Sequence, residues 1–283
     1  MKLTLEQVQA MNMVQLDIFK HFTEVCAQLH LTYYMVHGSL LGSIKYNAFF
    51  PYDDDIDVAM PRKDYNRLLK EGQKYFPENM FVQSLESEEN YPLVFSKIRR
   101  SDTAFMQPAM KQFGINQGMF IDVFPIDNWP ANALTRKALN FKELFLKVRI
   151  GAQIKKDVKV SPFKRVAFAV SRILYPSWRK AVRAKENIYA NVPQSGKVIV
   201  VGAKDAERGI PGEWFQDGTK GMFENVEITM PADCKKYLTC IYGDYQNYNP
   251  VGKYMNPDET ITVSAEQVNT QKSYKDFLQE AAD

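Results

Sequence analysis

The chain has 283 residues, 45% of them hydrophobic, with three cysteines and a formal net charge of +3. This length and apolar content allow a full hydrophobic core, in one large or two small domains. The sequence has no apolar run of 18 residues and no signal-peptide block near Lys2, which argues for a cytoplasmic protein over secreted and membrane-spanning classes. The cysteines have no metal-type spacing and are predicted to be reduced thiols.

The first predicted element is a helix. Thr4-Leu5-Glu6-Gln7 forms a capping box, in which the first and last side chains satisfy free backbone N–H groups. Apolar side chains then recur at helical spacing, with Gln15 as the one interruption, at Val8, Met11, Ile18, Phe22, Val25 and Leu29. We expect this helix to pack against a sheet.

A phosphate site is predicted at the next strand-to-helix turn. Residues 33–37 are β-prone, and Gly38 and Ser39 then precede a helical pattern. Backbone N–H groups at the start of a helix can bind a phosphate, and Ser39 adds a hydroxyl donor. Gly38 and Ser39 are therefore candidate phosphate-binding residues.

Four aspartates follow in the segment DDDID, at positions 53–55 and 57. Carboxylates this dense repel one another unless a cation or a proton neutralises them. In an extended strand Asp55 and Asp57 would project from one side, with Ile56 pointing into the core. Mg²⁺ is typically held by one or two carboxylates together with substrate phosphates, so we predict a Mg²⁺ or Mn²⁺ site. Asp53 is a reserve ligand, and Asp54 is assigned to the turn.

Two different roles for the aspartates stay open. A loop of aspartates can be a solvated turn, and nucleotide-sugar glycosyltransferases also use an Asp-x-Asp pair. A calcium-binding loop is disfavoured, because an apolar run follows where that loop needs a glycine and a distal glutamate. The helix start at Gly38 and Ser39 favours nucleotidyltransferase-like geometry instead.

After a helix that follows Pro61, three strands are predicted, at residues 80–85, 94–99 and 119–124. Lys97 and Arg99 alternate on the second, so both cations would share a face and could neutralise a diphosphate. The alternative is an exposed cationic edge strand. This alternation of helices and strands predicts an α/β (α+β) fold, with a nucleotidyltransferase-like mixed sheet flanked by helices.

Asp122 is a lone carboxylate in a strand that is otherwise apolar, and a buried charge needs a partner. It could complete the metal site with Asp55 and Asp57, and it could accept a proton from an attacking hydroxyl. The alternative is a buried ion pair with an arginine. Asp127, beyond Pro125, is predicted to be a turn or cap residue.

The chain then becomes strongly basic. Residues 136–190 contain fifteen Lys and Arg against three acidic residues. Residues 163–174 place an apolar face, including Val166, Val170 and Ile173, beside Lys164, Arg165 and Arg172. This basic amphipathic helix predicts peripheral contact with the inner face of a membrane or with an anionic acceptor. The alternative is a basic or solvated layer over an acidic core; nucleic acid is not expected, because exposed interleaved aromatic residues are lacking.

Towards the C-terminus we predict strands at 197–203 and 223–230, a loop at 209–221, a capped helix at 233–242 and a helix near 274–278. The predicted organisation is a catalytic core with its N-terminal helix (1–134), a basic helical insertion (135–190) and a C-terminal part that completes the domain (191–283).

The motifs resemble those of the LicD family. The matching blocks are GSLLG at 38–42, PYDDDIDV at 51–58, MPR at 60–62, FSKIRR at 95–100, FIDVFPID at 120–127 and YGDY at 242–245. Two positions depart from the family pattern: Tyr52 stands where Trp is usual, and Asn249-Pro250 replaces a more proline-rich end.

The resemblance implies a nucleotidyltransferase-type fold and transfer of a phosphorylated alcohol from a CDP-linked donor onto a glycan hydroxyl. Phosphocholine from CDP-choline is the best-known cargo of the family, and fukutin-type relatives imply ribitol phosphate. The acceptor would be a cell-surface glycan precursor, as in lipopolysaccharide, teichoic acid or capsule. A glycosyltransferase and a non-catalytic module that binds anionic glycans or lipids remain the alternatives.

Overall fold

The computed structural model of the protein describes residues 1–50, 53–154, 162–203, 209–249, 255–256 and 258–280, with the backbone alone at 162–165. Tyr52 and Pro250, at which the chain departs from the family pattern, lie outside the described residues, as do the side chains of Phe163, Lys164 and Arg165.

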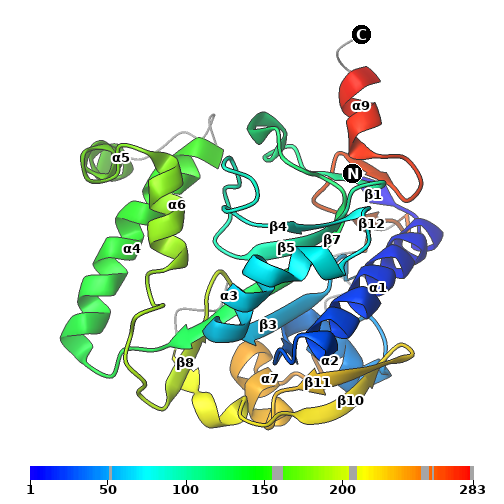
Figure 1. Cartoon of the computed structure of the whole chain (residues 1–283), viewed down its shortest axis with the longest axis horizontal. Coiled ribbons are helices and arrows are strands. Elements are labelled where there is room, and N and C mark those ends of the chain that lie inside the picture. The colour runs from blue at the N-terminus through cyan, green and yellow to red at the C-terminus, as the bar shows by residue number, and fades with distance from the viewer. Residues whose placement is uncertain (51–52, 155–161, 204–208, 250–254, 257, 281–283) are drawn as a thin grey trace.

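The centre of the molecule is a seven-stranded mixed sheet (Figure 1). Five strands run in the order β2-β3-β7-β5-β4, and β8 pairs with β7 and with β9. β3 and β7 are parallel, and the other neighbours are antiparallel. The strands are β2 (Tyr34–Met35), β3 (Asp57–Pro61), β4 (Met80–Gln83), β5 (Ser96–Arg100), β7 (Met119–Asn128), β8 (Lys197–Val200) and β9 (Ile210–Pro211). This mixed sheet with flanking helices confirms the predicted α/β class.

The helices around the sheet follow the sequence closely. α1 (Leu5–Gln28) begins with the predicted capping box between Thr4 and Gln7, and it packs against β7 and β5. α2 (His37–Tyr46) begins at the predicted strand-to-helix turn, and α3 (Arg62–Glu71) follows β3 directly. α7 (Cys234–Tyr242) has Asp233 as its N-cap and contacts α2, and α9 (Tyr274–Glu280) ends the described chain. The short 3₁₀ turns are η1 (Gly72–Tyr75), η2 (Lys111–Phe113) and η3 (Gly212–Trp214).

β7 is longer than predicted, and Asp127 lies inside it. One edge of β7 pairs with β5 up to Val123 and with β8 from Ile126, so Pro125 lies where the partner changes and its missing N–H is not needed there. Asp127 is buried and accepts bonds of 2.8 and 2.6 Å from Arg62. The prediction of a turn or cap residue was therefore wrong: Asp127 anchors the start of α3 to the sheet.

The basic segment forms a helical lobe of α4 (Ala133–Ile154), α5 (Pro162–Leu174) and α6 (Trp178–Glu186), which lies to one side of the sheet (Figure 1). A second apolar cluster joins α4 and α6 to β8, through Leu146, Val182 and Ile199 among others. Within the part of the chain that the structure describes, no helix combines the length and apolar content needed to cross a bilayer.

The C-terminal part contains more strands than predicted. A hairpin of β10 (Thr219–Phe223) and β11 (Val226–Met230) replaces the single strand expected at 223–230, and Glu224 in its turn has a left-handed φ of 54°. β9, η3 and part of β10 lie in the segment predicted to be a loop. The remaining strands pair β1 (Lys2–Leu3) with β12 (Ile261–Thr262) and β6 (Ala104–Met106) with β13 (Gln267–Asn269). Cys26, Cys234 and Cys240 are free thiols, as expected.

Candidate active site

Sheet register brings three charged residues into one row. Asp57 on β3 is paired with Asp122 on β7, and Asp122 is paired with Lys97 on β5. Residues in register on adjacent strands present their side chains to the same face, about 5 Å apart. Charges from positions 57, 97 and 122 therefore meet at a single point of the sheet.

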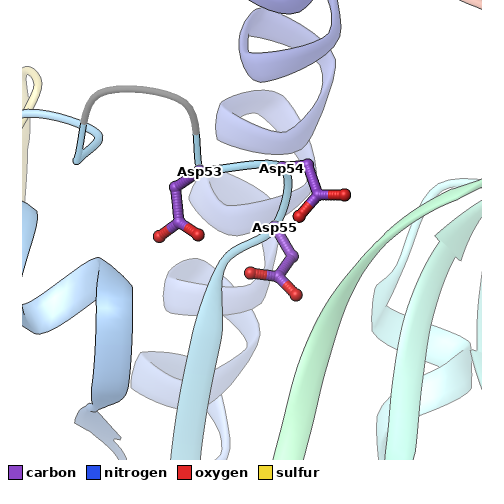
Figure 2. Close-up of side chains that lie close together, drawn as sticks. All are labelled: Asp53, Asp54 and Asp55. Atoms are coloured by element: carbon purple, nitrogen blue, oxygen red, sulfur yellow. The ribbon is translucent and has the colours of Figure 1, made fainter. Parts of the chain in front are cut away.

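The carboxylates form two groups that share Asp55. One oxygen from each of Asp55, Asp57 and Asp122 lies within 4.8 Å of the others, and the same holds for Asp53, Asp54 and Asp55. Figure 2 shows the second group on the loop that leads into β3. β3 begins only at Asp57, so Asp55 belongs to this loop. The expectation that Asp55 and Asp57 both lie on the strand was therefore wrong for Asp55. The structure nevertheless brings together the three residues predicted to be metal ligands.

Burial and the proximity of the other carboxylates raise the pKa values of the aspartates in this cluster. Burial raises the pKa of Asp55 and Asp57 well above the ordinary value, and repulsion from Asp57 and Asp122 respectively adds to the rise. The pKa of Asp53 is raised to about 7, by burial and by Asp54. Oδ2 of Asp53 is buried without a hydrogen-bond partner among the described residues. An oxygen-rich cluster that repels itself and leaves an oxygen unpartnered fits a hard divalent cation such as Mg²⁺ or Mn²⁺.

The predicted phosphate turn holds the aspartate loop. Ser39 is buried, and its Oγ accepts a 2.9 Å hydrogen bond from the backbone N–H of Asp57. A Cβ on Gly38 would lie 2.4 Å from Oδ2 of Asp53, so only glycine leaves room for that carboxylate. Both residues therefore fix the position of the aspartates, and their contact with a phosphate stays a prediction.

Gln15 is a site residue to which the sequence analysis gave no function. It is fully buried in α1, and its side chain donates a 2.7 Å hydrogen bond to the backbone carbonyl of Asp54. This contact ties the middle of the aspartate loop to the longest helix of the core. The signal was present in the sequence, because Gln15 was the polar interruption of an otherwise apolar stripe.

Lys97 and Arg99 are both buried on β5, which lies between β4 and β7, so the alternative of an exposed edge strand is wrong. Lys97 forms an ion pair with Asp122, and its Nζ lies 3.3 Å from the centre of the Phe120 ring. Burial lowers the pKa of Lys97, and Asp122 opposes this shift. The alternative of an arginine partner for Asp122 is thus corrected to a lysine.

Arg99 is engaged away from the cluster. Its guanidinium donates to the side-chain oxygen of Gln83 at 2.5 Å and to the carbonyl of Gly118 at 2.6 Å. Lys97 therefore contacts the carboxylate cluster through Asp122, whereas Arg99, two residues further along β5, bonds to Gln83 and Gly118. Contact of Arg99 with a diphosphate stays a prediction.

An aromatic group lies beside the carboxylates. Burial raises the pKa of Tyr242, and the charges of Asp53 and Asp57 add to the rise, so this hydroxyl lies within electrostatic range of the cluster. The Tyr242 ring is 4.9 Å from that of Tyr248, which in turn contacts Phe50 at 6.2 Å. Tyr242 opens the YGDY block, but the sequence alone assigned it no place in the site.

A cluster of carboxylates on a mixed sheet, next to the start of a helix, is the arrangement expected of a nucleotidyltransferase-type domain. A family model described as LicD/FKTN/FKRP, nucleotidyltransferase domain, matches residues 30–178, which is more than half of the chain. The chain belongs to the LicD family. It is also 26% identical over 259 residues to the lipopolysaccharide cholinephosphotransferase LicD of Haemophilus influenzae, an alignment that covers 88% of this chain and 94% of that protein.

The raised carboxyl pKa values predict that stability without metal falls as pH rises. Between the ordinary pKa of 3.8 and the value of about 7 for Asp53, the folded state binds more protons than the unfolded state. In EDTA, Tm should therefore fall from pH 5 to pH 8. Saturating Mg²⁺ should raise Tm by roughly 5 °C at pH 8 and by less at pH 5, where protons compete.

Differential scanning fluorimetry with EDTA or Mg²⁺ measures this effect. Glu186→Gln is the matched control, because burial raises the pKa of Glu186 to about 7 but this residue contacts Tyr65, outside the cluster. The control should keep the full response to Mg²⁺. A metal response that is equal at both pH values would contradict the prediction.

Proposed function

We propose that this protein transfers a phosphorylated alcohol, with phosphocholine as the first candidate, from a CDP-linked donor onto a hydroxyl of a cell-surface glycan precursor, with release of CMP. The enzyme class rests on the family: the chain is a LicD-type phosphotransferase. The CDP-linked donor, the metal ion and the glycan acceptor are proposed in addition to this enzyme class. The observation that carries them is the gathering of Asp55, Asp57 and Asp122 at the row that also contains Lys97.

Asp55, Asp57 and Asp122 would hold Mg²⁺ or Mn²⁺, which when bound supplies positive charge to the donor diphosphate. The proposed roles of the chain's own groups are charge placement and proton transfer. Gly38, Ser39 and nearby amides bind a donor phosphate, and Lys97 and Arg99 add positive charge on the sheet side.

The reaction is an in-line displacement at the phosphorus that carries the alcohol. The acceptor oxygen forms the new P–O bond, the bond to CMP breaks, and the acceptor proton passes to the carboxylate of Asp122. Positioning and charge neutralisation supply most of the rate in such transfers.

Two observations support phosphocholine as the cargo. The similar protein from Haemophilus influenzae is named as a cholinephosphotransferase. In addition, the rings of Tyr242 and Tyr248 lie 4.9 Å apart, the charges of Asp53 and Asp57 act on the Tyr242 hydroxyl, and aromatic faces attract quaternary ammonium groups. Glycerol and ribitol phosphate, which lack this cation, would gain nothing from the rings.

A thermal-shift panel with Mg²⁺ tests the donor, using CDP-choline, CDP-glycerol, CDP-ribitol and UDP-sugars. A ligand at 100 times its dissociation constant stabilises a protein by about 2.7 kcal/mol. We expect CDP-choline to give the largest shift, and the product assay to detect CMP. Stabilisation by a UDP-sugar with release of UDP would instead identify a glycosyltransferase, and no response to any nucleotide would favour the non-catalytic module.

A further inference from the structure

The helical lobe (α4, α5 and α6, residues 133–154, 162–174 and 178–186) has large apolar side chains exposed to solvent. On α5, Val166 is 64% exposed and Ile173 is 79% exposed. On α4, Leu134 and Phe141 are similarly exposed. The burial of such side chains is the main driving force of folding and association, so several of them exposed on one small lobe point to an interaction surface.

The orientation of α5 accounts for its exposed side chains. Among the side chains of α5 that the structure describes (166–174), Ala167 and Ser171, four residues apart, are buried, and the helix packs against α4. Val166, Val170 and Ile173 recur at intervals of four and three residues, which places them on one stripe of the helix. Over residues 166–174, the two buried side chains are thus small and the bulky apolar stripe faces outwards, the reverse of a helix that packs only within its own protein.

The charge of the lobe indicates which kind of partner binds its exposed apolar surface. The segment 136–190 has a surplus of basic residues, fifteen against three, in a chain whose net charge is only +3. Lys137, Lys142, Arg172 and Lys180 are exposed on the lobe. The rest of the chain is correspondingly acidic, so an anionic surface would attract the lobe and repel the core. The lobe thus combines exposed apolar side chains with exposed Lys and Arg, a combination typical of helices that lie in the interface of an anionic membrane.

We propose that the helical lobe docks peripherally on an anionic phospholipid bilayer, with the Val166–Val170–Ile173 stripe of α5 inserted at the headgroup boundary and the exposed lysines on the lipid phosphates. A second copy of the chain is a less suitable occupant, because two lobes with the same basic surplus would repel each other. Docking would hold the catalytic sheet next to membrane-bound acceptors, but the binding itself requires neither donor nor acceptor.

The test is co-sedimentation of the full chain with vesicles of phosphatidylcholine containing 30% phosphatidylglycerol, compared with pure phosphatidylcholine. We expect binding to the anionic vesicles that weakens in 0.5 M salt. The double variant Val166→Gln/Ile173→Gln should weaken binding at least tenfold, and Lys137→Gln/Lys142→Gln about fivefold for each charge removed. Because these side chains are exposed, the variants should keep the wild-type Tm.

Met13→Gln is the matched control, because Met13 is 64% exposed, like Val166, but lies on α1, outside the lobe. It should bind vesicles as the wild type does. Equal binding to both vesicle types, or binding unchanged by either double variant, would overturn the proposal. The proposal would also be overturned if the wild type did not bind vesicles but formed a dimer by light scattering, and the Val166→Gln/Ile173→Gln variant were monomeric. Because the assay contains no nucleotide, failure here would leave the proposed phosphotransfer intact.

Discussion

Asp57→Asn is expected to lower the rate of phosphoalcohol transfer by about a thousandfold and to leave the protein folded. Asp57 lies at the β3 end of the charged row, in register with Asp122, and shares the carboxylate cluster with Asp55. Asparagine has nearly the same shape but carries no negative charge, so the cluster would lose one of its three anionic ligands. The backbone N–H of residue 57 would still donate to Ser39.

The same substitution should make the metal-free protein more stable. Burial and the charge of Asp122 raise the pKa of Asp57, which means that its ionised form is disfavoured in the folded state at neutral pH. In EDTA at pH 8, Asp57→Asn should therefore melt above the wild type, and the Mg²⁺-induced rise in Tm should be lost. This opposite movement of activity and stability distinguishes a ligand of the cation from a structural aspartate.

Asp217→Asn is the control for this prediction, since Asp217 is an exposed carboxylate after η3. It should retain activity within twofold. Turnover of Asp57→Asn near the wild-type rate, or an unchanged response to Mg²⁺, would exclude Asp57 from the site.

Local chemistry made much of the fold predictable. The capping box of Thr4 and Gln7 and the apolar spacing from Val8 to Leu29 depend on neighbours in the chain, and both predicted α1 correctly. The gathering of Asp55, Asp57 and Asp122 was also anticipated, because a lone carboxylate in an apolar strand needs partners wherever that strand lies.

The parts that were missed depend on which strands become neighbours. The pairing of β5 with β7 places Lys97 opposite Asp122 and buries Arg99 away from the cluster. The change of partner along β7 lets the strand continue through Pro125 to Asp127, where local propensity indicated a turn. Likewise, the spacing within α5 identified its apolar stripe, but only the packing against α4 shows that the stripe faces outwards.

Lys97→Met is expected to destabilise the protein by about 4 kcal/mol, because it leaves Asp122 buried without its cation. For a chain of this size the loss corresponds to a fall in Tm on the order of 10 °C. Methionine retains the length and apolar stem of the lysine, so packing beside Phe120 would be largely kept. The loss of stability would therefore come from the unpaired charge of Asp122. Burial raises the pKa of this carboxyl group, and Lys97 opposes that rise.

The double variant Lys97→Met/Asp122→Asn separates this charge effect from a packing defect. Removal of both charges leaves no unpaired ion, so the double variant should recover much of the lost Tm. Together with Asp122→Asn alone, it should give a coupling energy of opposite sign to the single effects. Lys220→Met is the control, because Lys220 pairs with Glu227 at 3.2 Å on the solvent-exposed hairpin, and it should stay within about 2 °C of the wild type. If the double variant melted no higher than Lys97→Met, the ion pair would not be what Lys97 contributes. We expect the double variant to be folded but unable to transfer the phosphoalcohol, because Asp122 is the proposed metal ligand and base. That result would assign both the stability and the activity to the charges of Lys97 and Asp122.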